Sequence, residues 1–162
     1  MAVENILLGY GIFSIGETPI GLTRGGGSFT VETEYREIEA DGDKGAVKGR
    51  VVIDRQDAKM TINALTAFGS VSMAKYYPAL ADTTGTVKST LKIVEGDYQE
   101  VTWVGKTLDG KSVTIKLENA LNMGGLDLTL EDKDEVIPEL EFTATYLETA
   151  RDTAPWSVVF GE

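Results

Sequence analysis

The sequence predicts a mainly β domain, a sandwich or barrel of antiparallel strands with one flanking α-helix and a long protruding β-hairpin arm. Two observations predict this class. Hydrophobic residues recur at every second position through most of the chain, with glycine-containing turns between the runs. Only one stretch, at about 66–77, has the spacing of a helix. Because 42% of the 162 residues are hydrophobic, the chain can bury one core, and a single domain over 1–162 is expected.

The stretch 22–65 is predicted to form one long β-hairpin. Alternation gives each of its strands an inner face, made of Phe29, Val31, Thr33 and Tyr35 in the first strand and of Ala58, Met60, Ile62 and Ala64 in the second. The middle of the hairpin, at about 37–55, carries charges of both signs and few large apolar residues, so it cannot bury itself. We expect this segment to be an arm that contacts a partner copy.

The other elements follow from the same periodicities. A glycine-bearing strand that bends or bulges is expected at 6–15, and the helix at 66–77 should end before Pro78. From Thr86 the alternation predicts inward side chains at Val87, Leu91 and Ile93, and Asp109-Gly110 predicts a hairpin. After the acidic loop 131–135, a last strand has its inner face formed by Leu140, Phe142, Ala144 and Tyr146. The apolar tail 155–160 should dock on its own core or on a neighbour.

Composition excludes several functions. The net charge of −11, from 15 basic and 26 acidic residues, provides no basic surface for gripping phosphates. The absence of cysteine and histidine removes disulfides, thiolate chemistry, and the commonest neutral-pH base and zinc ligand. The N-terminal stretch lacks the positive charge of a signal peptide, and its apolar run is interrupted by glycine. Neither export nor a membrane span is predicted.

An enzyme would have to be built from carboxylates, lysines and hydroxyls. The pairs Glu32/Glu34 and Glu139/Glu141 could act as acid and base, but solvated strand faces are the simpler interpretation. The segment 41–45 begins like a calcium loop without its later ligands, the loop 131–135 is more typical of a solvated connection than of a cation site, and Gly25-Gly26-Gly27 lacks the context of a phosphate loop. We therefore predict no enzyme, and no catalytic, cofactor or metal site.

The order of the elements resembles that of phage tail tube proteins, the major tail proteins of long, non-contractile (siphophage) tails. The resemblance spans the chain and is carried by the N-terminal apolar strand ILLGYGIFSI, the hairpin GGGSFTVETEYREIEADGDKGAVKGRVVIDRQDAKMTINAL, the helix AFGSVSMAKYYPAL and the closing stretch NALNMGGLDLTLEDKDEVIPELEFTATYLE. The same fold serves contractile tails and phage-tail-like bacteriocins, so the resemblance leaves the particle type open.

The resemblance implies a structural virion protein that self-assembles into hexameric rings, which stack into a tube for DNA ejection. It implies contacts with the tape-measure, tail-tip and tail terminator proteins, assembly in the host cytoplasm, no cofactor and no membrane contact. DNA would pass through the lumen without specific binding. The arm would bridge rings through Glu39, Asp41, Asp43, Lys44, Lys48 and Arg50. The lumen would be lined by at least one of the acidic pairs, Glu32/Glu34 or Glu139/Glu141, since an acidic wall repels the DNA backbone.

The alternative function is a monomeric β-sandwich binding module of the carbohydrate or adhesin type. It would need exposed aromatic side chains, for which the sequence offers Trp103, Tyr76 and Tyr98.

Overall fold

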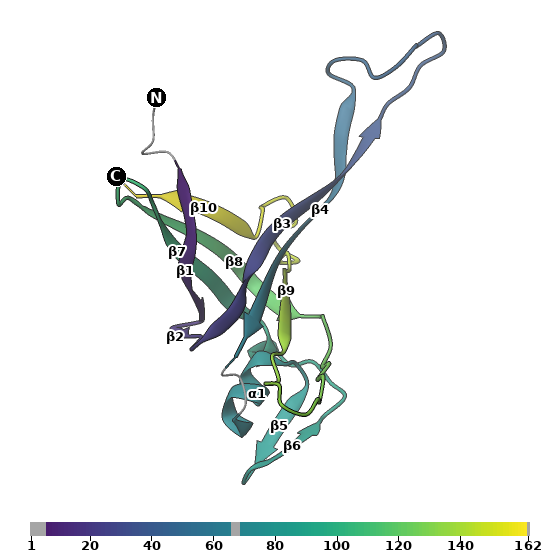
Figure 1. The fold of residues 1–162 in the computed structure, drawn as a ribbon. Helices are drawn as coiled ribbons and strands as arrows, with labels where there is room; N and C mark the ends of the chain where they lie inside the picture. Colours follow the sequence, from purple (N-terminus) through teal and green to yellow (C-terminus); the bar gives the residue numbers. More distant parts are fainter. Residues whose placement is uncertain (1–5, 66–68, 162) are drawn as a thin grey trace.

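The computed structural model describes residues 6–65 and 69–161. It contains one large antiparallel sheet, one two-stranded sheet and one short α-helix, which confirms the predicted mainly β class (Figure 1). In chain order the elements are β1 (Leu7–Ile15), β2 (Thr18–Pro19), β3 (Thr23–Glu37), β4 (Val51–Ala64), α1 (Ser70–Tyr76), β5 (Leu80–Thr83), β6 (Thr86–Ser89), a 3₁₀ turn at Glu95–Asp97, β7 (Gln99–Thr107), β8 (Ser112–Asn122), β9 (Glu139–Ala144) and β10 (Trp156–Phe160).

The large sheet has the strand order β2-β1-β7-β8-β9-β4-β3, and β10 is added beside β8. Two strands therefore share one edge of β8. β10 pairs with residues 113–117, whereas β9 pairs with residues 120–122. The sheet curls so that β1 and β3 approach each other, but among the described residues no strand pairing joins them and closes a barrel.

The core lies on the concave side of this sheet. It is built by the alternating residues of the hairpin and of β7, β8 and β9, as their periodicity predicts. Fully buried members include Met60, Ile62, Val101, Leu117 and Leu140. β10 docks on the same domain, where the Trp156 ring lies 5.9 Å from the Phe29 ring, measured between centroids.

The predicted hairpin is confirmed, and it is the longest element of the molecule. β3 and β4 pair from Thr23↔Ala64 to Glu37↔Val51, and their far ends carry the loop 38–50 well away from the body (Figure 1). The bulge predicted in the first strand is present as a register shift between Leu7 and Gly11.

The helix is shorter than predicted. It begins at Ser70, and residues 66–68 of the predicted span lie outside the described residues. It ends at Tyr76 because Tyr77, the residue before Pro78, takes an extended conformation. The helix lies beside the β5–β6 hairpin at the end of the sheet opposite the arm (Figure 1).

Some predicted inward positions are wrong. β6 stops at Ser89, and Leu91 and Ile93 lie in the following loop with 92% and 50% of their surface exposed. Tyr35 is 67% exposed because it lies beyond the body, where no other strand covers the hairpin. Tyr146 follows the end of β9 and is 37% exposed, with its hydroxyl donating to the Gln56 carbonyl at 2.9 Å.

Candidate assembly surfaces

The tip of the arm is held by its own polar groups. The Arg50 guanidinium donates to both carboxylate oxygens of Asp43 at 3.0 and 2.9 Å, and Asp43 also accepts from the Ala40 amide at 2.9 Å. The Ile38 amide donates to the Arg50 carbonyl at 2.8 Å and closes the loop. Of the six residues predicted to contact a neighbouring ring, Asp43 and Arg50 are thus partly buried in this internal pair. The other four are exposed at the tip: Glu39, Asp41, Lys44 and Lys48.

The base of the arm is marked by a bulge. Glu34 pairs with Arg55 and Tyr35 with Ile53, so Asp54 has no opposite residue in the ladder. The two carboxylate oxygens of Asp54 instead share the single N–H of Arg36 Nε, at 3.1 and 2.9 Å.

Gln56, just inside the bulge, joins the arm to the last strand. Its amide nitrogen donates to the Thr33 hydroxyl at 3.2 Å, and its amide oxygen accepts from Trp156 Nε1 at 3.0 Å. Its backbone carbonyl accepts the Tyr146 hydroxyl. Sequence reasoning missed this residue, since a glutamine at an inward position of an alternating strand carries no signal of its distant partners.

The four acidic residues predicted as alternative lumen faces lie on one face of the sheet. Glu32 is opposite Asp57, and Glu34 is opposite Arg55. Farther along β4, Thr61 is opposite Glu141, and Asn63 is opposite Glu139. Residues opposite each other in a ladder point to the same side, and so do alternate residues of one strand. The side chains of Glu32, Glu34, Asp57, Glu139 and Glu141 therefore lie on one side of the sheet, where the cations are Arg55, Lys59 and, at the base of the arm, Arg36, and we call it the hairpin acidic face.

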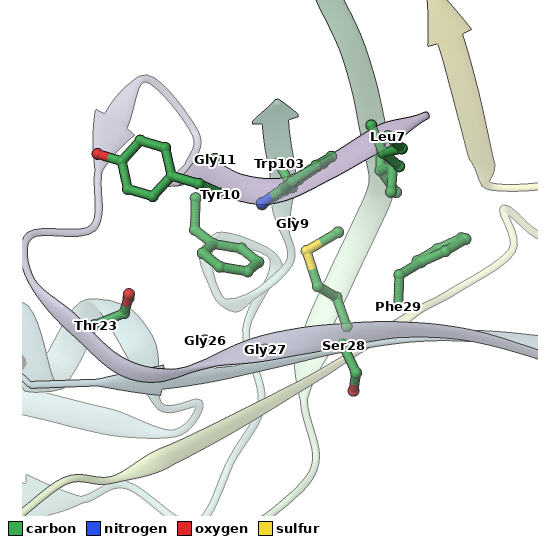
Figure 2. Close-up of a pocket in the computed structure, with 13 residues that line it drawn as sticks. Leu7, Gly9, Tyr10, Gly11, Thr23, Gly26, Gly27, Ser28, Phe29 and Trp103 are labelled. Carbon is green, nitrogen blue, oxygen red and sulfur yellow. The ribbon is translucent and has the colours of Figure 1, made fainter. Parts of the chain in front are cut away.

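A hollow of about 400 Å³ lies between β1 and β3, and we call it the β1–β3 slot (Figure 2). None of the residues that line it is charged, and its larger side chains are Leu7, Tyr10, Phe13, Phe29, Met60, Trp103 and Ile115. At two positions of its wall there is room only for glycine. A Cβ on Gly11 would lie 2.4 Å from the Trp103 ring, and one on Gly27 would lie 2.1 Å from the Thr61 carbonyl oxygen.

The acidic loop 131–135 is tied to the start of β3. Arg24 donates to Glu135 at 3.0 Å, and this bond lowers the pKa of the Glu135 carboxyl. Within the described ranges no group of three or more acidic residues is arranged to hold a metal ion. In the same part of the chain no helix is long and apolar enough to cross a membrane.

The aromatic residues required by the binding-module alternative are mostly inside the molecule. Trp103 is 8% exposed and Tyr76 is 6% exposed, so neither is available to a ligand. Tyr98, at 40%, is the one of the three on the surface.

No family model and no curated protein matches the sequence. In fold, the chain is similar to a chain of the solved structure described as "Cryo-EM Structure of an Extracellular Contractile Injection System, PVC sheath-tube complex in extended state". The TM-score is 0.53 at 13% sequence identity, and the match covers 98% of this chain and 93% of that chain. The chain therefore shares its fold, over almost its entire length, with a component of a sheath-tube complex.

Proposed function

We propose that this protein is a structural subunit that self-assembles into a tube, the tail tube of a virion or of a related injection particle. The observation that supports the proposal is the fold similarity to a component of a sheath-tube complex, which covers 98% of the chain. The proposed unit is a hexameric ring, and rings stack head to tail. Heterologous contacts of this kind cover sheet edges that would otherwise pair without control.

Two surfaces have separate tasks in this proposal. The arm bridges neighbouring rings, because it extends beyond the body and its exposed tip charges are free to meet another copy. The hairpin acidic face lines the lumen, where its negative charge keeps DNA from adhering during ejection. The tape-measure, tail-tip and terminator proteins are the proposed partners inside the tube and at its ends.

The test of assembly is a sizing column followed by negative-stain microscopy at high protein concentration. The expected result is concentration-dependent growth from small species to tubes of uniform width. A protein that stays monomeric throughout would contradict the proposal and favour the binding module.

The role of the arm is tested by replacing residues 39–49 with Asn-Gly. The Ile38–Arg50 hydrogen bond makes this the natural position for a two-residue hairpin turn, so the domain should fold normally. We expect isolated rings without tubes. Long tubes of normal appearance from this variant would show that the arm tip does not bridge rings.

A further inference from the structure

The arm has an apolar face that nothing in the described chain covers. Beyond the bulge, Tyr35 lies opposite Ile53, and Val51 follows on the same side of β4. These three side chains are 67%, 57% and 44% exposed, in the order Tyr35, Ile53, Val51. Tyr35 is on the same face of β3 as Phe29 and Val31, which pack against the core. The core-facing stripe of the hairpin thus continues into solvent.

The opposite face of the arm at this level is polar. It carries the Arg36–Asp54 ion pair, beside Val52, which lies opposite Arg36. Three apolar side chains, Tyr35, Val51 and Ile53, thus lie together on one side of the arm, with Glu37 opposite Val51 at the outer end, and we call the three apolar residues the arm stripe. Exposed apolar groups gathered on one side of a protruding element are typical of a contact surface.

The β1–β3 slot has a complementary character. Gly9 and Gly26 are among the residues that line it, and a Cβ added at either position would meet nothing within 4 Å. Figure 2 shows β1 and β3 on opposite sides of the slot, with Phe29 extending from β3 toward β1 and Trp103 lying against β1. Beyond the β2 pairing at Ser14 and Ile15, the edge of β1 away from β7 has no strand partner in the described part of the chain.

The arm stripe cannot fill the slot of its own molecule. Gly27 in the slot wall and Tyr35 are eight residues apart on one extended strand, which corresponds to about 26 Å. A second copy can supply the stripe. Because the stripe and the slot are different surfaces, the contact is heterologous and repeats from copy to copy.

We propose that the arm stripe of one copy inserts into the β1–β3 slot of the next, with the Tyr35 and Ile53 side chains as its anchors. This inference rests on the proposed function and adds the specific contact by which the arm holds its neighbour. The charged tip then lies beyond the slot, on the surface of the receiving copy.

The experiment compares three variants with the parent protein by sedimentation velocity and negative-stain microscopy. The first, Tyr35→Ser with Ile53→Ser, removes the anchors from an exposed surface. The second, Gly9→Leu, adds a bulky side chain at a residue that lines the slot, where a Cβ meets no atom within 4 Å. The matched control is Gly96→Leu, whose Cβ also meets nothing within 4 Å and which lies outside the slot.

We expect both the anchor and the slot variants to lose tubes at concentrations where the parent and the control form them. An equimolar mixture of the two variants should contain a mixed oligomer that neither gives alone, because the slot-filled copy still has an arm and the anchorless copy still has a slot. Normal tubes from either variant would overturn the inference while leaving the proposed function intact. A parent that never assembles would overturn both.

A second measurement does not depend on the folding of the slot variant. The chain has no cysteine, so Ile53→Cys introduces a single thiol. Assembly should slow its reaction with a maleimide at least tenfold, and more than it slows the reaction of Arg36→Cys on the polar side. Equal reaction rates of Ile53→Cys in monomers and tubes would overturn the inference.

Discussion

Tyr77 is a buried residue with an unused polar group. Its side chain is 5% exposed, and its hydroxyl has no hydrogen-bond partner among the described residues. Burial raises its pKa, because the charged phenolate would lose its hydration. The neighbouring Tyr76 is also buried and has a raised pKa for the same reason.

We predict that Tyr77→Phe raises the free energy of unfolding by about 1 kcal/mol, since it removes an unpaired buried hydroxyl. The stability gained by Tyr77→Phe should increase as the pH rises above about 10. A pKa raised in the folded state contributes stability that is complete below the unfolded value of about 10 and is lost as the pH rises through the folded value. Urea denaturation at pH 7 and pH 10.5 tests this, with Tyr98→Phe as a surface control. A lower stability of Tyr77→Phe at both pH values would contradict it.

Gln56 gives a second prediction at the scale of one side chain. Gln56→Leu keeps the approximate volume but leaves Trp156 Nε1 and the Thr33 hydroxyl without their partner. The free energy of unfolding should fall by about 1–2 kcal/mol. Hydrogen exchange should also become faster in the arm strands.

The control for Gln56→Leu is Gln99→Leu, which breaks a side-chain bond to the Lys75 carbonyl far from the arm. It should lower stability without a local change in arm exchange. If the two variants give the same exchange pattern, Gln56 does not hold the arm in place.

At the scale of elements, the sequence predicted strands wherever alternation and a local turn agree. The β3–β4 and β7–β8 hairpins are examples, because their strands are joined by short or glycine-containing connections and their inward residues are apolar. The run after Thr86 shows the opposite case. Leu91 continues the alternation in the sequence but has a φ of 56°, so the chain leaves the extended conformation there. β5 was not predicted, since LADT contains no alternating pattern.

The candidate surfaces were predictable in part for a related reason. The arm belongs to a single hairpin, so its position and its charges could be predicted from one continuous stretch of the sequence. The single hairpin acidic face depends on the pairing of β4 with β9, whose residues are about 80 positions apart, and periodicity within a strand says nothing about its neighbour. The β1–β3 slot is formed by two strands that do not pair with each other, so no pattern within either strand predicts it.

At the scale of the whole molecule, the hairpin acidic face gives a prediction for the assembled tube. Changing Glu32, Glu34, Glu139 and Glu141 together to lysine alters the net charge from −11 to −3 and makes this face basic. In assembled particles we expect slower DNA exit at low salt, because each lysine attracts a phosphate. Added salt should restore the rate by screening.

A matched control changes Glu131, Asp132, Asp134 and Glu148 to lysine, which shifts the net charge equally at other exposed positions. Its exit rate should stay close to that of the parent. Equal rates for the parent and the hairpin-face variant at low salt would show that this face is not luminal.

The position of β10 also affects when the arm is fixed during synthesis. β3 and β4 can pair soon after residue 64 has been made, because the hairpin is local. Trp156, however, reaches Gln56 from 100 positions later in the chain, and long loops of this kind close late. A ribosome-bound chain therefore has a formed hairpin whose base is not yet held against β10. If the protein forms the proposed tube, the direction of the arm is set only after residue 156 has emerged, so a chain that has not yet reached this residue should be a poor partner for another copy.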